Sequence, residues 1–306
     1  MRNQKTRQKD AAICFSGQVR KFELCYPYIK KNLLDNLGSY DIFCCAEDDS
    51  DFEKIKILNP VKTKKVRSSE VDKVIKPKIK FLNKHNYKSY ILPQSPRFNF
   101  RNILQQLFKI NGAYELLEDY TKEKKVSYKY FIRIRFDFLP LDKINPSNFK
   151  IKNMEVITPD INCIKPRTQI NDMFCITRDQ DTFKTYCSLY ESFEDAVQKV
   201  GVDFSLKQKL YFSFEKKYSD FFFYIFNNPQ QRGLKSAKKI LGFFLLFPKK
   251  FYKEFKARNR CDTERTFFYH LTSAKNKIRE EKIPFLIVRN SMEGLLMLGQ
   301  SSKAPR

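Results

Sequence analysis

The sequence predicts an α/β fold in which a mostly parallel β-sheet is flanked by helices. Residues 11–19 (AAICFSGQV) form an apolar run that ends in a polar Ser-Gly turn, as a strand of such a sheet does. Residues 23–37 have the pattern of a helix, and residues 40–48 (YDIFCCAED) form a second apolar strand that ends in acids. A strand, a helix and a strand within about 35 residues indicate a βαβ unit, whose strands are parallel.

The rest of the chain continues this alternation. Residues 50–80 are lysine-rich and mixed in pattern, and residues 88–96 predict a short strand before a proline-marked loop. Residues 99–125 predict a helix, because apolar side chains recur there at helical spacing. These side chains are Ile103, Leu107, Ile110, Tyr114 and Leu117. The later elements are strands at 128–138, 154–160 and 172–178, a helix at 179–197 capped by Asp179 or Asp181, and a helix and strand within 262–290.

We expect a single domain over residues 11–290, between a basic tail at 1–10 and a loosely ordered tail at 291–306. Residues 204–260 resemble a helical insertion that is rich in aromatic and basic side chains. Within it, residues 229–260 hold ten Lys or Arg against one acid, Glu254. Two interpretations stay open. The insertion either packs in the core, or places an apolar wedge in a basic surround against an anionic membrane surface.

Composition excludes several classes of protein. Of the 306 residues, 42% are hydrophobic and 15% are aromatic, which a disordered chain does not reach. No window of about 18 apolar residues exists to span a bilayer, and no apolar core follows the basic start as it does in a signal peptide. We therefore expect a cytoplasmic protein, with a peripheral position at the inner face of a membrane as the alternative.

The cysteine and histidine content argues against structural metal or disulfides. The chain has eight cysteines, none of them in a CxxC pair, and most lie inside apolar runs. Such cysteines are typically buried free thiols. Only two histidines are present, His85 and His270, so a histidine-based metal site is not expected either.

The net charge of +25 has two explanations. Contacts with nucleic-acid phosphates would use it. An AT-rich coding sequence would also produce abundant Lys, Phe, Ile, Asn and Tyr. Under either explanation the chain attracts anions such as phosphates, nucleotides or an acidic membrane surface.

Residues 128–138 (YKYFIRIRFDF) combine the pattern of a strand with charges at alternate positions. Strand side chains alternate between two faces, so Arg133, Arg135 and Asp137 share one face. Burying them in a sheet covered on both sides is costly unless they bind a ligand or one another. Ligands of open α/β sheets bind at the carboxyl ends of strands, where Asp137 falls. We expect Asp137 to hold Mg²⁺ or Mn²⁺ and both arginines to clamp a diphosphate, with a buried Arg–Asp pair as the alternative.

Two more segments carry polar side chains beside predicted strands. The turn in residues 14–22 lets a ligand approach the backbone closely at a glycine, and it also offers hydrogen bonds and a positive charge. Its sequence matches neither the P-loop motif nor the GxGxxG motif. Its candidate residues are Ser16, Gly17, Gln18 and Arg20. In residues 170–177 (INDMFCIT), Asp172 is a second carboxylate, a general base for an acceptor hydroxyl, or an ordinary turn residue. Glu264 fits the first turn of a helix.

Taken in order, these segments resemble a family of microbial and viral glycosyltransferase-like proteins. That family has an ICFSGQxR strand, a YxxxIRxRxD strand, an NDxF segment with its helix, and a late PExxLxxHL segment. Here ICFSGQVR, YKYFIRIRFD, NDMF and TERTFFYHL stand in these places, with Thr263 where proline is usual. The resemblance covers roughly residues 11–45, 97–190 and 261–289.

The resemblance implies the nucleotide-diphospho-sugar transferase fold called GT-A, a Rossmann-like sheet that binds a nucleotide sugar at its strand ends, usually with Mn²⁺ or Mg²⁺. Asp137 stands where the DxD motif of that family places a metal ligand. This chain has Arg135-Phe136-Asp137 instead, so one carboxylate of the pair is missing and Arg135 would take over part of the charge neutralisation.

The implied activity is the transfer of a sugar from a nucleotide-diphosphate donor to a glycan or lipid-linked acceptor. Asp172 would activate the acceptor, Asp137 would hold the metal, and the remaining candidates would hold the nucleotide. These are Ser16, Gly17, Gln18, Arg20, Arg133 and Arg135. Two alternatives stay open, a catalytically inactive membrane-associated scaffold and a basic nucleic-acid-binding protein. The alternating Arg-Arg-Asp face counts against both, because neither needs a carboxylate at a strand end.

Overall fold

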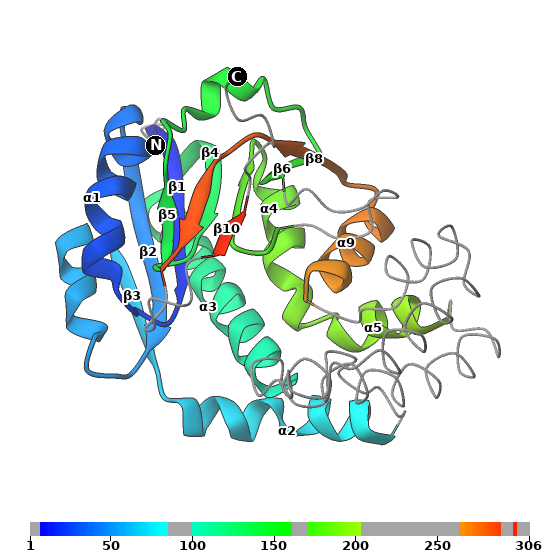
Figure 1. The fold of residues 1–306 in the computed structure, drawn as a ribbon. Helices are drawn as coiled ribbons and strands as arrows, with labels where there is room; N and C mark the ends of the chain where they lie inside the picture. The colour runs from blue at the N-terminus through cyan, green and yellow to red at the C-terminus, as the bar shows by residue number, and fades with distance from the viewer. Residues whose placement is uncertain (1–6, 85–99, 161–170, 203–262, 289–295, 299–306) are drawn as a thin grey trace, which may run out of the picture.

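The structure is a computed structural model that describes residues 7–84, 100–160, 171–202, 263–288 and 296–298. At its centre lies a seven-stranded sheet in the order β3-β2-β1-β4-β7-β6-β8 (Figure 1). The strands are β1 (Arg7–Gly17), β2 (Tyr40–Glu47), β3 (Lys62–Val66), β4 (Val126–Ile134), β6 (Glu155–Pro159), β7 (Phe174–Thr177) and β8 (Lys277–Glu281). Only β7 runs against its neighbours, so the predicted α/β fold with a mostly parallel sheet is confirmed.

The predicted βαβ unit forms the middle of this sheet. Helix α1 (Phe22–Asn32) connects β1 to β2, which pair in parallel from Ala11↔Tyr40 to Gly17↔Ala46. On its other side β1 pairs in parallel with β4, ending at Phe15↔Ile134. The strands are continuous apolar runs because both faces of the sheet are covered, which is what parallel sheets require.

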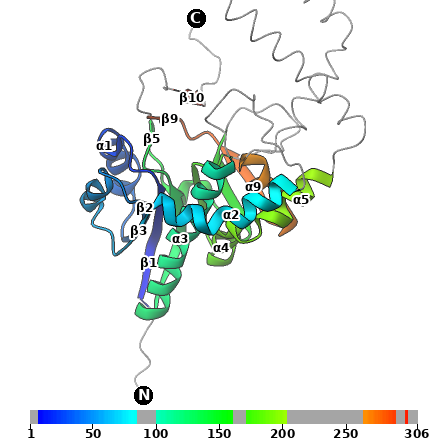
Figure 2. The same cartoon turned by 90° about the horizontal axis from the view of Figure 1, so that it is seen from below.

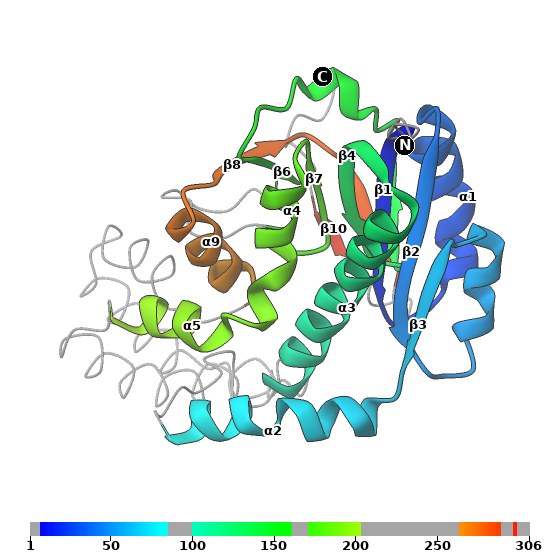
Figure 3. The same ribbon diagram turned by 180° about the vertical axis from the view of Figure 1, so that it is seen from behind.

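Two apolar layers cover the two faces. On one face, α3 (Phe100–Lys124), α4 (Gln180–Cys187), α5 (Phe193–Val202) and α9 (Thr263–Ser273) share one buried cluster with the sheet (Figure 3). Helix α2 (Ser68–Lys84) joins the same cluster and packs on α3. On the other face lie α1 and a small antiparallel sheet of β5 (Phe138–Pro140), β9 (Phe285–Ile287) and β10 (Leu296–Leu298). Short 3₁₀ helices are at Leu34–Asn36, Phe52–Leu58, Pro146–Phe149 and Ser188–Tyr190.

Helix α3 lies close to the sheet at a glycine. A Cβ atom added to Gly112 would lie 2.8 Å from the Sγ atom of Cys45 on β2. Real Cβ atoms do not approach that closely, so the absence of a side chain at Gly112 sets the distance between α3 and β2. Gln106 and Lys109, in the half of α3 that precedes Gly112, contact Asp172 before β7 and Glu47 at the end of β2.

Several predicted elements have different bounds in the structure. The strand predicted at 128–138 ends at Ile134, because the amide of Phe138 donates to Arg135 O and closes a turn before β5. The helix predicted at 179–197 is interrupted at Ser188–Tyr190, although Asp179 caps it as expected, with its side chain accepting from the amide of Thr182 at 2.7 Å. The mixed segment 50–80 contains β3 and most of α2, which the sequence pattern did not predict.

Some predictions lie outside the described residues. These are the strand at 88–96, the insertion at 204–260, Cys163, Cys261, His85 and most of the two tails. The six cysteines that the structure describes are free and buried, as expected. Across the described helices, none is long and apolar enough to cross a bilayer.

Candidate functional site

The strand order reverses at the carboxyl ends of β1 and β4. From β1 the chain proceeds to β2 and β3 on one side, and it returns later to β4 on the other side. Open α/β sheets bind their ligands at such a reversal, beyond the carboxyl ends of the strands. Ser16 and Gly17 end β1 at this place, and Ile134 ends β4. The reversed strand β7 starts at the same edge, because Phe174 pairs with Ile134. Asp172 therefore arrives beside the two strand ends.

Gly17 shapes the end of β1. Its φ of 129° lies in a region that side-chain-bearing residues rarely adopt, and an added Cβ would meet nothing within 4 Å. The position therefore needs glycine for its backbone conformation, and the space beside it is open. A backbone turn with open space at a strand end lets a ligand come close to the peptide groups.

Arg133 is a buried link between β1 and the start of β7. Its Nε donates to Ser16 Oγ at 3.3 Å, and its guanidinium also donates to the carbonyl oxygen of Asp172. The side chain is 0% exposed, and its second terminal nitrogen has no hydrogen-bond partner in the described part of the chain. Arg133 thus holds together two of the segments that the sequence predicted to converge.

Arg135 and Asp137 form a two-pronged ion pair in the turn that follows β4. Arg135 Nε lies 2.8 Å from Asp137 Oδ1, and its terminal nitrogen lies 2.6 Å from Oδ2. The Asp137 side chain is 4% exposed and that of Arg135 is 20% exposed, so the guanidinium is the solvent-facing member. Burial opposes the charge of Arg135, but the carboxylates of Asp137 and Asp172 raise its pKa further. The pair has no net charge, and its guanidinium is the member that faces the strand ends.

Asp172 faces the same place from the start of β7. Its Oδ2 accepts a hydrogen bond from Gln106 Nε2 of α3 at 2.8 Å, and the residue is 6% exposed. Its charge contributes to the raised pKa of Arg135, so the two side chains are electrostatic neighbours. A carboxylate held by an amide can accept a proton from a hydroxyl that reaches it.

A second polar cluster at the end of β2 joins the site. Glu47 accepts from Lys109 Nζ at 2.7 Å and from the hydroxyl of Ser68, and the side chain of Gln18 also hydrogen-bonds to it. Burial would raise the pKa of Glu47, but these hydrogen bonds outweigh it and lower the pKa. Gln18 thereby connects the turn after β1 to the end of β2.

The structure brings most of the predicted residues together, in two adjoining groups. Ser16, Arg133 and Asp172 are joined by hydrogen bonds, and the Arg135–Asp137 pair adjoins them through Asp172. Arg20 is half-buried and, in the part of the chain that the structure describes, makes no hydrogen bond or ion pair with them.

Three contributors were missed by the sequence analysis: Gln106, Lys109 and Glu47. Glu47 had a signal, because it ends an apolar strand in the segment YDIFCCAED. Gln106 and Lys109 had none, since single polar residues within a helical pattern are ordinary.

The carboxylates here do not fit a divalent metal. Both oxygens of Asp137 are bound by Arg135, and a cation at Asp137 would have to displace that guanidinium or lie beside its charge. Within the described ranges, no group of three or more His, Cys, Asp and Glu side chains could hold a metal ion. The Arg135–Asp137 ion pair therefore occupies the carboxylate that the sequence motif assigned to Mn²⁺ or Mg²⁺.

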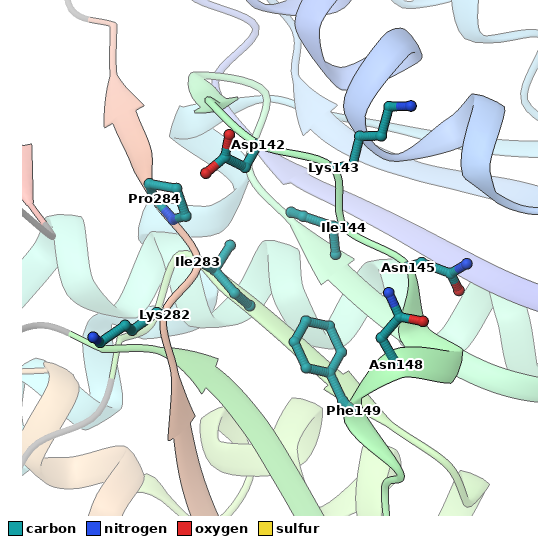
Figure 4. A pocket seen from close by; sticks show the side chains of 9 residues that line it. All are labelled: Asp142, Lys143, Ile144, Asn145, Asn148, Phe149, Lys282, Ile283 and Pro284. Atoms are coloured by element: carbon teal, nitrogen blue, oxygen red, sulfur yellow. The ribbon is translucent and has the colours of Figure 1, made fainter.

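A small cavity lies at the other end of α1, away from this site (Figure 4). It is lined by Asp142, Lys143, Ile144, Asn145, Asn148, Phe149, Lys282, Ile283 and Pro284. The amide of Ile144 donates to the carbonyl oxygen of Asn32, the last residue of α1, whereas the strand-end site precedes Phe22, the first residue of α1. The cavity and the strand-end site are therefore separate.

The fold and site define an α/β protein with a polar site, lined by charges of both signs, where its strand order reverses. The chain belongs to the family described as a domain of unknown function, DUF7796, which matches residues 6–179. This segment contains every predicted site residue. No curated protein matches the chain. Sixty solved chains match, among them mouse xyloside xylosyltransferase 1 in its apo form, at 8% identity and a TM-score of 0.42, covering 90% of this chain and 85% of that one.

Proposed function

We propose that this protein is a GT-A-type glycosyltransferase that takes a sugar from a nucleotide-diphosphate donor. One observation carries the proposal: four separate segments supply Ser16 and Gly17, Arg135, Asp172 and Glu47 to the edge where α/β sheets bind nucleotides. Such a site supports several reactions of nucleotides. Glycosyl transfer is favoured among them because the ICFSGQVR, IRIRFD and NDMF motifs resemble those of glycosyltransferase-like proteins.

The chemistry divides between the two sides of the transferred sugar. The acceptor hydroxyl attacks the anomeric carbon, the bond from that carbon to the diphosphate oxygen breaks, and a nucleoside diphosphate leaves with added negative charge. Arg135, the more exposed member of its ion pair, stabilises that charge. A guanidinium can donate two parallel hydrogen bonds to the oxygens of one phosphate. Asp172 accepts the proton of the acceptor hydroxyl.

The donor would lie across the turn after β1. Gly17 leaves open space beside its backbone, and Ser16 and Gln18 offer hydrogen bonds on either side of it. Arg20 adds a positive charge next to this turn. The acceptor would be a glycan or a lipid-linked saccharide, and residues 229–260 would contact an anionic membrane surface.

Donor turnover tests the proposal. Purified protein is incubated with UDP-, GDP- and dTDP-sugars, with Mn²⁺ or with EDTA, and released nucleoside diphosphate is measured. Water is the acceptor in this assay, so the products are the free sugar and the nucleoside diphosphate. We expect release from one nucleotide class, and Asp172→Asn to lower the rate by about 10²–10⁴-fold, as loss of a general base does. The matched control is Asp142→Asn, an exposed aspartate beside the separate cavity, which should keep the wild-type rate. Equal rates for Asp172→Asn and wild type would remove Asp172 from the mechanism.

A further inference from the structure

Helix α2 carries four exposed lysines on a single face. Lys73, Lys76, Lys80 and Lys84 are all exposed, and their spacing of three, four and four residues aligns them along the helix. We call them the lysine stripe. Eleven residues of helix separate the first from the last, so the stripe is about 17 Å long.

The lysine stripe points away from the body of the protein. The buried residues of α2 are Val71, Ile75 and Leu82, which pack in the cluster that covers the sheet. At 3.6 residues per turn these three lie on the opposite side of the helix from the stripe. The apolar face of α2 is therefore already used, and its outer face is free for a partner.

Nearby acids do not neutralise the lysine stripe. Asp72 is bound by Arg101 through two hydrogen bonds of 2.7 and 2.6 Å, and Glu70 lies 3.6 Å from Arg67. The acid Glu194 is paired with Lys78, which is outside the stripe. Within the described ranges, none of the four stripe lysines has an acidic partner. Four uncompensated charges in a line favour an extended anionic surface over a single small anion.

The stripe lies at the same end of the protein as the candidate site. Helix α2 follows β3, and the hydroxyl of its first residue, Ser68, donates to Glu47 at the carboxyl end of β2. Figures 1 and 3 both show α2 along the lower end of the molecule, and Figure 2 shows it from that side. A surface that contacts the stripe would therefore lie next to the strand ends.

We propose that the lysine stripe docks the protein on an anionic membrane, with lipid headgroups as its ligand. The apolar neighbour of the stripe favours a membrane over nucleic acid. Val74 is 52% exposed beside the lysines, and an exposed apolar side chain next to basic ones fits the headgroup boundary of a bilayer. The proposal does not depend on glycosyl transfer.

Vesicle co-sedimentation of the full chain tests this docking surface. The vesicles are phosphatidylcholine alone or phosphatidylcholine with 30% phosphatidylserine, at roughly physiological ionic strength. The test variant is K73Q/K76Q/K80Q/K84Q. The control variant, K31Q/K124Q/K143Q/K152Q, removes the same charge from four exposed lysines on other elements. Circular dichroism checks that both variants fold. In parallel, the wild type and both variants are titrated into a labelled single-stranded RNA to measure its binding.

We expect wild type to bind only the anionic vesicles. Each stripe lysine contributes about fivefold to the partition coefficient between vesicles and solution. The test variant should therefore lose about two to three orders of magnitude in this coefficient, and the control variant only a few-fold. Three results would overturn the proposal: no binding of wild type to anionic vesicles, equal losses in both variants, or stripe-dependent binding to RNA that is tighter than binding to vesicles.

Discussion

Arg135 and Asp137 bind each other through two hydrogen bonds, of 2.8 and 2.6 Å, in the turn where β4 ends. The pair stands at the position where the sequence motif suggested a metal-binding carboxylate. The pair has no net charge, but its guanidinium is the more exposed member and holds its N–H donors in a fixed orientation at the edge of the sheet. In the proposed transferase, Arg135 would supply part of the charge stabilisation that the sequence motif assigned to a metal ion.

Removing one member of the ion pair should destabilise the protein more than removing both. Arg135→Ala leaves the nearly buried Asp137 without a partner, so we expect a loss of about 3 kcal/mol in the free energy of unfolding. Arg135→Ala/Asp137→Asn removes both charges and should recover part of that loss. Urea unfolding of the wild type, Arg135→Ala, Asp137→Asn and the double variant measures the coupling energy between the two side chains. Strictly additive effects would show that the pair is not coupled.

The close contact of α3 with β2 predicts a steric effect at Gly112. A methyl group there would lie 2.8 Å from the Sγ of Cys45, so Gly112→Ala should destabilise the protein by about 1–3 kcal/mol. Gly112→Ala/Cys45→Ala removes the opposing sulfur and should be more stable than the single Gly112 variant. Thermal unfolding compares the two. If adding Cys45→Ala does not raise the stability of Gly112→Ala, this contact does not limit the distance between α3 and β2.

Glu47 predicts an acid-sensitive component of stability. Although burial opposes it, hydrogen bonds led by Lys109 lower the pKa of Glu47 in the folded state. A lowered folded-state pKa contributes stability above the unfolded value of about 4.3, and this stability is lost as pH falls through the folded value. The unfolding free energy of wild type should therefore fall more steeply below about pH 5 than that of Glu47→Gln.

Lys109→Met gives a second test of the Glu47 cluster. Because it removes the hydrogen bond from Lys109, it should flatten the same part of the pH profile. Its overall stability should also fall, since Glu47 keeps a charge that is largely buried. Identical slopes in wild type and both variants would contradict the role of this cluster.

The cysteines predict low thiol reactivity in the folded protein. Burial raises the pKa of Cys25, Cys45 and Cys175 to about 12 each, and Cys14, Cys44 and Cys187 are also buried. The thiolate is the reactive form, so these six should resist labelling. A titration with DTNB at pH 8 should modify at most the remaining two of the eight cysteines quickly, and all eight in guanidinium chloride. Rapid labelling of three or more would show that part of the buried core opens readily.

The sequence allowed the parallel core of the fold to be predicted, because its signals are local. The apolar runs around Ile13 and Phe43, with a helical pattern between them, were enough for β1, α1 and β2. The cap at Asp179 was also visible, as an acid before a helical pattern. Helix α2 was missed because its many lysines and Pro77 obscure the apolar spacing of Val71, Ile75 and Leu82.

The candidate site could be predicted only in part. Its residue types and strand-end positions were visible, but the direction of β7 was not, because strand pairing depends on contacts between distant residues. That direction brings Asp172 beside Arg135 and Arg133. The partners Gln106 and Lys109 come from a helix 60 or more residues away from the groups that they bind, and no local pattern identifies such pairs.

The central claim is that a nucleoside diphosphate binds at the ends of β1 and β4. Isothermal titration calorimetry of UDP, GDP and dTDP, in EDTA and in Mn²⁺, tests it most directly. To separate binding from stability, wild type is compared with Arg135→Ala/Asp137→Asn and with the distant control Asp142→Asn. The account predicts that one nucleotide binds in EDTA and that the double variant alone loses at least tenfold in affinity. Absence of binding for every nucleotide, or equal affinity in the double variant, would contradict it.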